Sequence, residues 1–298
     1  MTVGTAQPGA TSFRLYKRVV RVSIVKPVST TGSWFTTQPN AIVIENLRVQ
    51  FTVERSISKQ PNVCQITVTN LAPQTRTEIE ARPQIVIIEA GYDGNLKRLF
   101  TGDLRYAITT RDSADWNTVM QLGDADRAYR FSRVNRSYPP GTTYQTIAND
   151  CAAAMSAKIP ADMVPVLAAK QAVSGYSLQG PAHAEMTRLM QPFGREWSFQ
   201  DGQFQALQDG VPRLDNRSAF VISQDTGMIG SPEFGAPPRP GQRPMLRVRS
   251  LLYAGIMPGH QVRVTSRAIN GLFRAEKVRH TGDTHGADWM TELELTQL

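Results

Sequence analysis

The chain has 298 residues, of which 41% are hydrophobic and 19% charged, so it can form two or three small domains and is too apolar to be disordered overall. Its 22 glycines and 19 prolines favour a turn-rich β protein over a helical bundle. The two cysteines, Cys64 and Cys151, are too few for a disulfide framework and lack the C-x-x-C spacing of zinc or redox sites.

No targeting or membrane-spanning segment is predicted. The first residues, MTVGTAQPGATS, lack the basic start and the apolar stretch of a secretory signal, and no window holds about 18 consecutive apolar residues. We therefore expect a soluble product that is made in the cytoplasm, without membrane insertion by this chain.

The formal net charge of +8 could attract phosphates, acidic lipids or an acidic protein surface. The densest basic stretch is interleaved with apolar residues and holds Arg14, Lys17, Arg18 and Arg21. Other basic residues are scattered singly, such as Arg48, Arg105, Arg130, Arg188 and Arg274. This dispersed pattern is typical of solvated faces and argues against dedicated nucleic-acid recognition.

Period-two alternation predicts a strand-rich region over the first 125 residues. We expect a poorly ordered polar tail at 1–12, a loop at 29–40 and a helical turn before Pro83. About six or seven strands are predicted: 18–25, a second region at 41–44 and 47–53, 64–71, 84–92, 99–102 leading into 104–108, and 117–122. In the run 47–53, alternate residues share one face that must be buried: Leu47, Val49, Phe51 and Val53. Turns are predicted at 70–73 and 93–94, so this region can form a small barrel or sandwich.

The middle of the chain changes to a helical period. Thr142 or Thr143 can cap a helix that runs to about Lys158, with Ile147, Cys151 and Met155 on its apolar stripe. A second helix opens with Pro181 in its first turn and stops at 192–194. Its inward residues are Ala182, Met186, Leu189 and Met190.

A hairpin closes this middle region. Asp201-Gly202 separates two alternating runs, 197–200 and 203–207, and such a pair favours a type I′ turn. The residues from 128 to 215 are therefore predicted to form an inserted α+β module.

Strands resume near the C-terminus. Gly227 and Gly230 are interpreted as loop residues, and 237–241 is interpreted as a stiff proline-rich linker loop. The predicted strands are 246–251, 261–264, 273–278 and 289–295, with turns at 258–259, 270–271 and 282–283. This end is predicted to be a second antiparallel unit.

One cluster has the residue types of a metal site. His280, Asp283 and His285, with Asp288 nearby, bring imidazoles and carboxylates close together. On a hairpin, however, His280 would lie at a strand end and His285 in the turn, and no third and fourth zinc ligands follow at a suitable spacing. We favour a polar loop in which Asp283 accepts hydrogen bonds from turn amides.

No other constellation indicates catalysis. Cys151 and His183 could be imagined as a thiol protease pair, but a cysteine on the apolar face of a helix is usually an inert core residue. No carboxylate pair is marked by its context, and neither G-x-x-x-x-G-K-[ST] nor G-x-G-x-x-G occurs. We therefore assign no catalytic, cofactor-binding or metal-binding residues, expect no cofactor and expect no enzymatic activity.

The order of these elements resembles the baseplate hub family of tailed bacteriophages along nearly the whole chain. Four segments carry the resemblance: Glu45–Pro73, Ile87–Leu104, Thr226–Glu233 and Leu272–Leu295. Each segment alone is a weak indication of the family, but the four segments together and in this order are more specific. The sequence leaves open whether the tail is contractile or flexible.

The resemblance implies a mainly β fold with an α+β insertion and two antiparallel, tail-tube-like β-barrel or sandwich units. The implied domains are a first tube-like barrel at 1–127, the insertion at 128–215 and a second β unit at 216–298. It also implies a homotrimer in the tail baseplate of a virion, forming a ring around the tail channel and adapting the sixfold tail tube to the threefold central spike. Its implied partners are the tail tube protein, the central spike protein, the tape measure protein and other baseplate proteins, with DNA passing through the channel without sequence-specific binding.

Two rival functions remain open. One is a tail-tip cell-wall hydrolase with its site in the 128–215 module or at the His280/His285 loop. The other is a receptor-binding or carbohydrate-binding module, in which Tyr138, Tyr176 and Trp197 could stack on sugars, although the hairpin position of Trp197 favours core packing.

Overall fold

The computed structural model describes residues 17–25, 41–81, 84–208, 210–213, 219–235 and 244–298. The predicted tail at 1–12, the loop at 29–40 and the linker loop at 237–241 lie outside the described residues. Within the described part of the chain, no helix is long and apolar enough to cross a membrane.

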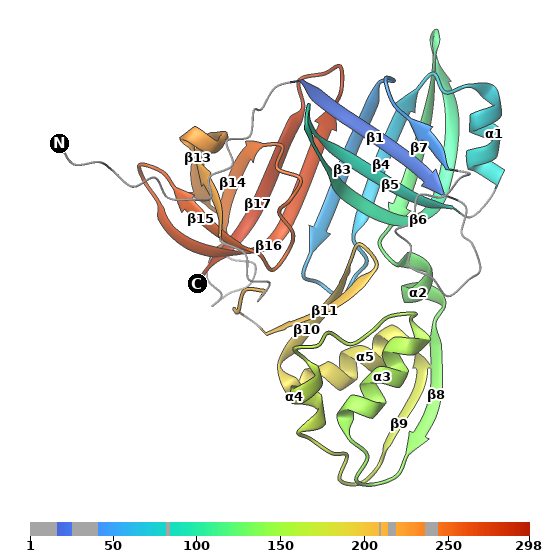
Figure 1. Cartoon of the computed structure of the whole chain (residues 1–298), viewed down its shortest axis with the longest axis vertical. Coiled ribbons are helices and arrows are strands. Elements are labelled where there is room, and N and C mark those ends of the chain that lie inside the picture. The colour runs from blue at the N-terminus through green and yellow to red at the C-terminus, as the bar shows by residue number, and fades with distance from the viewer. Residues whose placement is uncertain (1–16, 26–40, 82–83, 209, 214–218, 236–243) are drawn as a thin grey trace.

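Strands from both ends of the chain join in one 13-stranded sheet (Figure 1). Its N-terminal strands are β1 (Arg18–Val25), β2 (Ile42–Ile44), β3 (Val49–Ser56), β4 (Val63–Thr69), β5 (Ile85–Tyr92), β6 (Asn95–Asp112) and β7 (Asp115–Gly123). Its C-terminal strands are β12 (Phe220–Ser223), β13 (Met228–Phe234), β14 (Leu246–Leu251), β15 (Gln261–Thr265), β16 (Asn270–Asp283) and β17 (Trp289–Gln297). Helix α1 (Pro73–Ala81) lies between β4 and β5 in the chain, and the short 3-10 helix η2 (Gln224–Thr226) follows β12.

The strand order is β13-β14-β17-β16-β3-β4-β7-β6-β5-β1-β2, with β15 and β12 branching from β16. The two ends of the chain meet where β16 pairs with β3 in antiparallel register, His280 opposite Val53. The pairings are antiparallel except that of β12 with β15, which is parallel and was not predicted from the sequence. The predicted fold class, mainly β and antiparallel with some helices, is confirmed.

Buried apolar side chains form three clusters. The first lies inside the N-terminal strands and includes Val22, Phe51, Ile66 and Met120, and the second lies among the C-terminal strands. The third belongs to the middle of the chain and contains Cys151. Three cores fit a three-part chain, while the exact boundaries at 127/128 and 215/216 stay a prediction.

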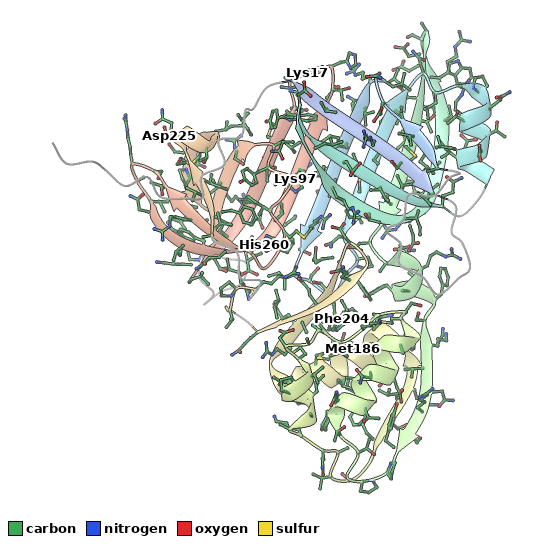
Figure 2. The ribbon with its side chains drawn as sticks, viewed as in Figure 1. Lys17, Lys97, Met186, Phe204, Asp225 and His260 are labelled. Carbon is green, nitrogen blue, oxygen red and sulfur yellow. The ribbon has the colours of Figure 1, made fainter. Side chains whose placement is uncertain are left out.

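The middle of the chain forms an α+β module beside the sheet (Figure 1). Its elements are α2 (Asp126–Phe131), β8 (Arg133–Tyr138), α3 (Tyr144–Ala154), α4 (Val164–Ala168), β9 (Tyr176–Pro181), α5 (Ala182–Met190), η1 (Gln191–Phe193), β10 (Arg195–Gln200) and β11 (Gln203–Gln208). Figure 2 shows Met186 of α5 next to Phe204 of β11, and both side chains belong to the core of the module.

The two predicted helices are present with small differences. Thr143 caps α3 by accepting a hydrogen bond from the backbone N–H of Thr146. The helix ends at Ala154 instead of Lys158, because the chain turns at Ser156, whose φ of 54° is left-handed. Pro181 directly precedes α5 as the last residue of β9, and Ala182, Met186, Leu189 and Met190 are buried as predicted.

One prediction about strand continuity is confirmed and one is wrong. As predicted, the run 99–102 leads into 104–108, and both belong to the single strand β6, whose register with β7 shifts between Leu104 and Tyr106. Gly230 was interpreted as a loop residue, and this is wrong. It lies within β13, whose register with β14 shifts between Ile229 and Glu233. Its φ of 72° explains why a glycine is used at this bulge.

Two predicted turns are also wrong. Asn270 and Gly271 begin β16, and the turn lies just before them, where the N–H of Ser266 donates to the carbonyl of Ile269. Gly282 and Asp283 are the last residues of β16. A Cβ at Gly282 would lie 2.3 Å from the ring of Phe51, so this glycine is needed for close packing and not for a turn.

Candidate functional site

The predicted His280 loop does not converge on a metal site. His280 is buried within β16, three residues before the strand ends, and its Nδ1 lies 2.9 Å from the Oγ of Thr291. His285 is exposed, with its Nδ1 2.9 Å from the Oγ of Thr284. In the described part of the chain, no three His, Cys, Asp or Glu residues are grouped to hold a metal ion.

Asp283 organises this loop through hydrogen bonds. Its carboxylate accepts from Arg48 Nη2 at 2.8 Å, from Gln50 Nε2 at 3.0 Å and from the backbone N–H of His285 at 2.9 Å. The hydrogen bond from Arg48 is the main reason that the pKa of Asp283 lies well below its usual range. The predicted role of Asp283 as an acceptor for a turn amide is therefore confirmed.

Cys151 and His183 do not form a catalytic pair. The Cys151 thiol is buried and donates to the carbonyl of Ala182 at 3.4 Å, and burial raises its pKa to about 12. His183 Nδ1 lies 3.0 Å from the carbonyl of Tyr129, and the two rings stack with centroids 4.3 Å apart. The prediction that Cys151 is a core residue is confirmed.

The three aromatic residues considered for sugar stacking have structural contacts. Trp197 is buried, stacks on Phe204 and donates from Nε1 to Thr187 Oγ at 3.1 Å. The Tyr138 hydroxyl donates to Asp150 at 2.8 Å, and Tyr176 lies beneath the Arg188 guanidinium. Core packing of Trp197 is confirmed, and the side chains of Tyr138 and Tyr176 are half-buried.

A buried ion pair links the module to the sheet. Arg55 of β3 donates from Nη2 to Asp201 Oδ1 at 2.7 Å and from Nη1 to Asp201 Oδ2 at 3.2 Å. Asp201 Oδ1 also accepts from the backbone N–H of Thr101 on β6 at 2.9 Å. The guanidinium of Arg55 lies 5.3 Å from the ring centre of Phe100. The β10–β11 turn is thus bound to two strands of the sheet at once.

The carboxylate of Asp124, which lies between β7 and α2, binds the same β10–β11 turn from another side. Its carboxylate accepts from the backbone N–H groups of Gly202 at 2.7 Å and Asp201 at 2.8 Å, and from Asn62 Nδ2 at 3.1 Å. Burial, and then the neighbouring Asp201 carboxylate, raise the pKa of Asp124 to about 6. We name Arg55, Asn62, Asp124, Asp201 and Gly202 the module latch.

The sequence predicts the Asp201-Gly202 turn but not the groups to which this turn binds. The turn has φ of 55° and 76°, as a type I′ turn requires, and this geometry presents both N–H groups to Asp124. A signal for Arg55 was available, because it continues the buried period-two face of β3 after Val53. An arginine on such a face must find a buried partner.

Two edge strands of the sheet, β2 and β13, resist strand addition. β2 has three residues, and β13 contains a bulge and Pro232, which has no N–H to donate. Short, bulged or proline-containing edge strands protect a sheet against further pairing. These two edge strands are therefore poor templates for pairing with a further strand.

The outer face of the sheet, which points away from its cores, is mostly polar. Over β3, β4, β7 and β6 it carries Thr52, Gln65, Thr67, Thr69, Asn117, Val119, Gln121, Tyr106 and Ile108. Over β3, β16, β17 and β14 opposite charges alternate across the strands: Glu54, Arg279, Glu292, Arg249, and Lys277, Glu294, Arg247. Such a face suits contact with water or with a polar partner.

Comparisons with known proteins identify the fold. No protein-family model and no curated protein sequence matches the chain. The solved structures of the 43 kDa tail protein of prophage MuSo2 from Shewanella oneidensis and of a tail protein from Neisseria meningitidis MC58 both match with a TM-score of 0.62. They are 9% and 11% identical to this chain, and each match covers 95% of it and 97% of the other protein.

A third match extends beyond phages. A component of the Escherichia coli type VI secretion system, itself structurally similar to the T4 tail proteins gp27 and gp5, has a TM-score of 0.54 and 12% identity. The match covers 84% of this chain and 73% of that protein. The likeness that the sequence predicted is confirmed as a shared fold.

Proposed function

We propose that this chain, which has the fold of phage tail proteins, is a structural protein of the tail baseplate. In this proposal it is a homotrimeric hub that forms a ring around the tail channel and adapts the sixfold tail tube to the threefold central spike. The observation that carries the proposal is the match to two tail proteins over 95% of the chain. The three-part division at 1–127, 128–215 and 216–298 belongs to the same proposal.

The arrangement of the sheet supports a ring-forming role. Two strand-rich units, each with its own buried cluster, are joined edge to edge through β3 and β16. Three copies of a chain with two such units place six strand-rich units around one axis. A protein that joins a sixfold tube to a threefold spike needs this combination of six similar units and three subunits.

The outer face of the sheet is better suited to line a channel through which DNA passes than to bind DNA. Its charged part pairs opposite signs, with Arg247 Nη2 3.4 Å from Glu294 and Arg279 Nε 3.6 Å from Glu54. Paired charges attract phosphates less than a concentrated basic patch does. This composition supports the proposal that DNA passes without sequence-specific binding.

We further propose a non-enzymatic role in the virion, with the tail tube, central spike, tape measure and other baseplate proteins as partners. The support is that the candidate groups are engaged in structural bonds: His280 with Thr291, Asp283 with Arg48 and Cys151 with Ala182.

Imaging of mixtures tests the proposal. The purified chain would be mixed with the tail tube and central spike proteins encoded beside it and imaged as single particles. The proposal predicts threefold particles that carry the spike on one side and tube rings on the other. Particles with tube and spike in which this chain is absent would contradict it.

A further inference from the structure

Two buried arginines hold the two ends of the β10–β11 hairpin. Arg55 and Arg274 are the largest side chains that are fully buried in the described part of the chain. Arg55 of β3 binds Asp201 at the tip of the hairpin. Arg274 of β16 donates from Nη1 to the carbonyl of Gln208, the last residue of β11, at 2.9 Å and to that of Val211 at 3.2 Å. Because a buried arginine needs partners for its charge and its N–H groups, the hairpin has a defined attachment at each end.

The attachment at Arg274 includes ionic, apolar and backbone contacts. Glu276 accepts two hydrogen bonds from the Arg274 guanidinium, at 2.7 and 3.0 Å. Leu207 of β11 packs against Gly259, where a Cβ would lie 2.6 Å from the Leu207 Cδ1 atom. The N–H of Arg213 donates to the Gly259 carbonyl at 2.8 Å. The end of the hairpin and the residues after it are therefore bound to β16 and to the loop that precedes β15.

The two arginines belong to different strand-rich units. Arg55 follows Val53 on β3, and Val53 is part of the buried cluster of the N-terminal unit. Arg274 lies between Phe273 and Ala275, which are part of the buried cluster of the C-terminal unit. Figure 1 shows the hairpin at the ends of these strands that face the module. The hairpin thus connects one unit to the other.

Strand pairing alone leaves the angle between the two units variable. β3 and β16 join the units, and their pairing ends at Ser56 and Lys277. Neighbouring strands are twisted relative to one another by about 10° to 35°, so one strand pair permits a range of angles. At the far end of this junction Trp289 packs on Phe51, with ring centroids 5.7 Å apart. At the end near Ser56 and Lys277 the hairpin spans the junction instead.

We propose that the β10–β11 hairpin is a strap that holds the two strand-rich units at one angle. In the proposed hub six units share one axis, so neighbouring units must be rotated by about 60° for the ring to close. A chain whose two units already have this angle loses less conformational freedom when three copies assemble. The purpose of the strap rests on the proposed hub, whereas the strap itself is a property of the single chain.

Distances between the two units test the strap. Nitroxide labels at Val43→Cys in β2 and Val221→Cys in β12 report on the two units, because both positions are exposed and the two native cysteines are buried. Double electron–electron resonance, with the labelled chain diluted into an excess of unlabelled chain, records the distance within one chain. The chain with an intact strap should give one narrow distance distribution.

Two strap variants release one end each. Asp201→Asn removes the carboxylate that binds Arg55, and Arg274→Gln removes the guanidinium at the other end. Their matched controls are Asp162→Asn and Arg263→Gln, which change exposed side chains outside the hairpin. The width of the distance distribution should increase at least about twofold in each strap variant, because the strand pair alone permits a range of twist. It should stay unchanged in both controls, and circular dichroism shows whether each variant is folded.

A distribution that stays narrow in either folded strap variant would overturn the strap, because the pairing of β3 with β16 would then fix the angle by itself. The native mass of the same samples tests the hub separately. A monomeric unmodified chain whose distribution broadens in the strap variants would remove the hub and leave the strap standing. A trimeric chain whose distribution stays narrow in the variants would remove the strap and leave the hub standing.

Discussion

Arg55 and Asp201 are separated by 146 residues in the sequence, and their side chains form a bidentate ion pair with an Nη2–Oδ1 distance of 2.7 Å. The Arg55 side chain is 1% exposed and that of Asp201 is 11% exposed. The pair binds the tip of the module hairpin to the strand that also joins the two ends of the chain. Because charge burial is tolerated only with a partner, this contact makes the position of the module depend on both residues.

Removing one partner should destabilise the fold strongly. Asp201→Ala leaves the Arg55 guanidinium buried without its carboxylate, and the expected loss in the free energy of unfolding is about 3 kcal/mol. Urea denaturation followed by circular dichroism measures it, with Asp225→Ala, an exposed carboxylate, as the control. The double variant with Arg55→Leu should lose less than the two single losses added together. Additive losses would show that the two side chains do not interact.

The β10–β11 hairpin shows which features the sequence could predict and which it could not. The Asp201-Gly202 turn and its flanking strands follow from local rules, because turn type depends on two neighbouring residues. The partner of Asp201 depends on how distant strands stack, which period-two patterns do not encode. β13 was missed for a related reason: Gly230 and Pro232 are typical of loops, and β14 supplies the pairing that makes the segment a strand.

The exposed face of β6 could not be predicted either. Tyr106 and Ile108 belong to an alternating run that predicts a strand, but the sequence does not say which face of that strand is covered. Only the sheet order reveals that β5 stops pairing at Asp103. The predicted polar role of the His280 loop could be reached from sequence, since it depends on the local bonding of Asp283 with His285.

Buried His280 should make stability depend on pH. Burial, and then the nearby Arg55 charge, lower the pKa of His280 to about 3, so the folded protein keeps the imidazole neutral. The unfolded chain binds a proton below about 6.5, so stability is full above that pH and falls as the pH drops toward 3. From pH 6.5 to 5 the expected loss from this residue is about 2 kcal/mol.

The measurement compares the unmodified chain with the His280→Gln variant by urea unfolding at pH 5 and pH 7.5. Asp124 acts in the opposite direction, because its raised pKa of about 6 lets the folded state bind a proton before the unfolded chain does. Since both proteins contain Asp124, the difference between their pH dependences isolates His280. Equal pH dependences would contradict a buried, neutral His280.

Both cysteine thiols should resist alkylation in the native protein. Burial raises the pKa of Cys64, and it raises that of Cys151 to about 12, so neither supplies thiolate near neutral pH. Mass spectrometry after iodoacetamide treatment at pH 8 should find unmodified native protein and two modified sites after denaturation. Rapid native alkylation of Cys151 would contradict its place in the module core.

The chain should not cleave peptidoglycan. Turbidity loss of purified cell walls should match a buffer control for the unmodified chain and for His285→Ala, whose exposed side chain can be removed without disturbing the core. Cleavage by the unmodified chain that disappears in the His285→Ala variant would establish the hydrolase instead.

The native mass of the purified chain, alone and with the central spike protein, decides whether the protein is a trimeric hub. A trimeric hub gives a species of three times 33.0 kDa that takes up one threefold spike. A chain that remains a 33.0 kDa monomer in both samples would contradict it.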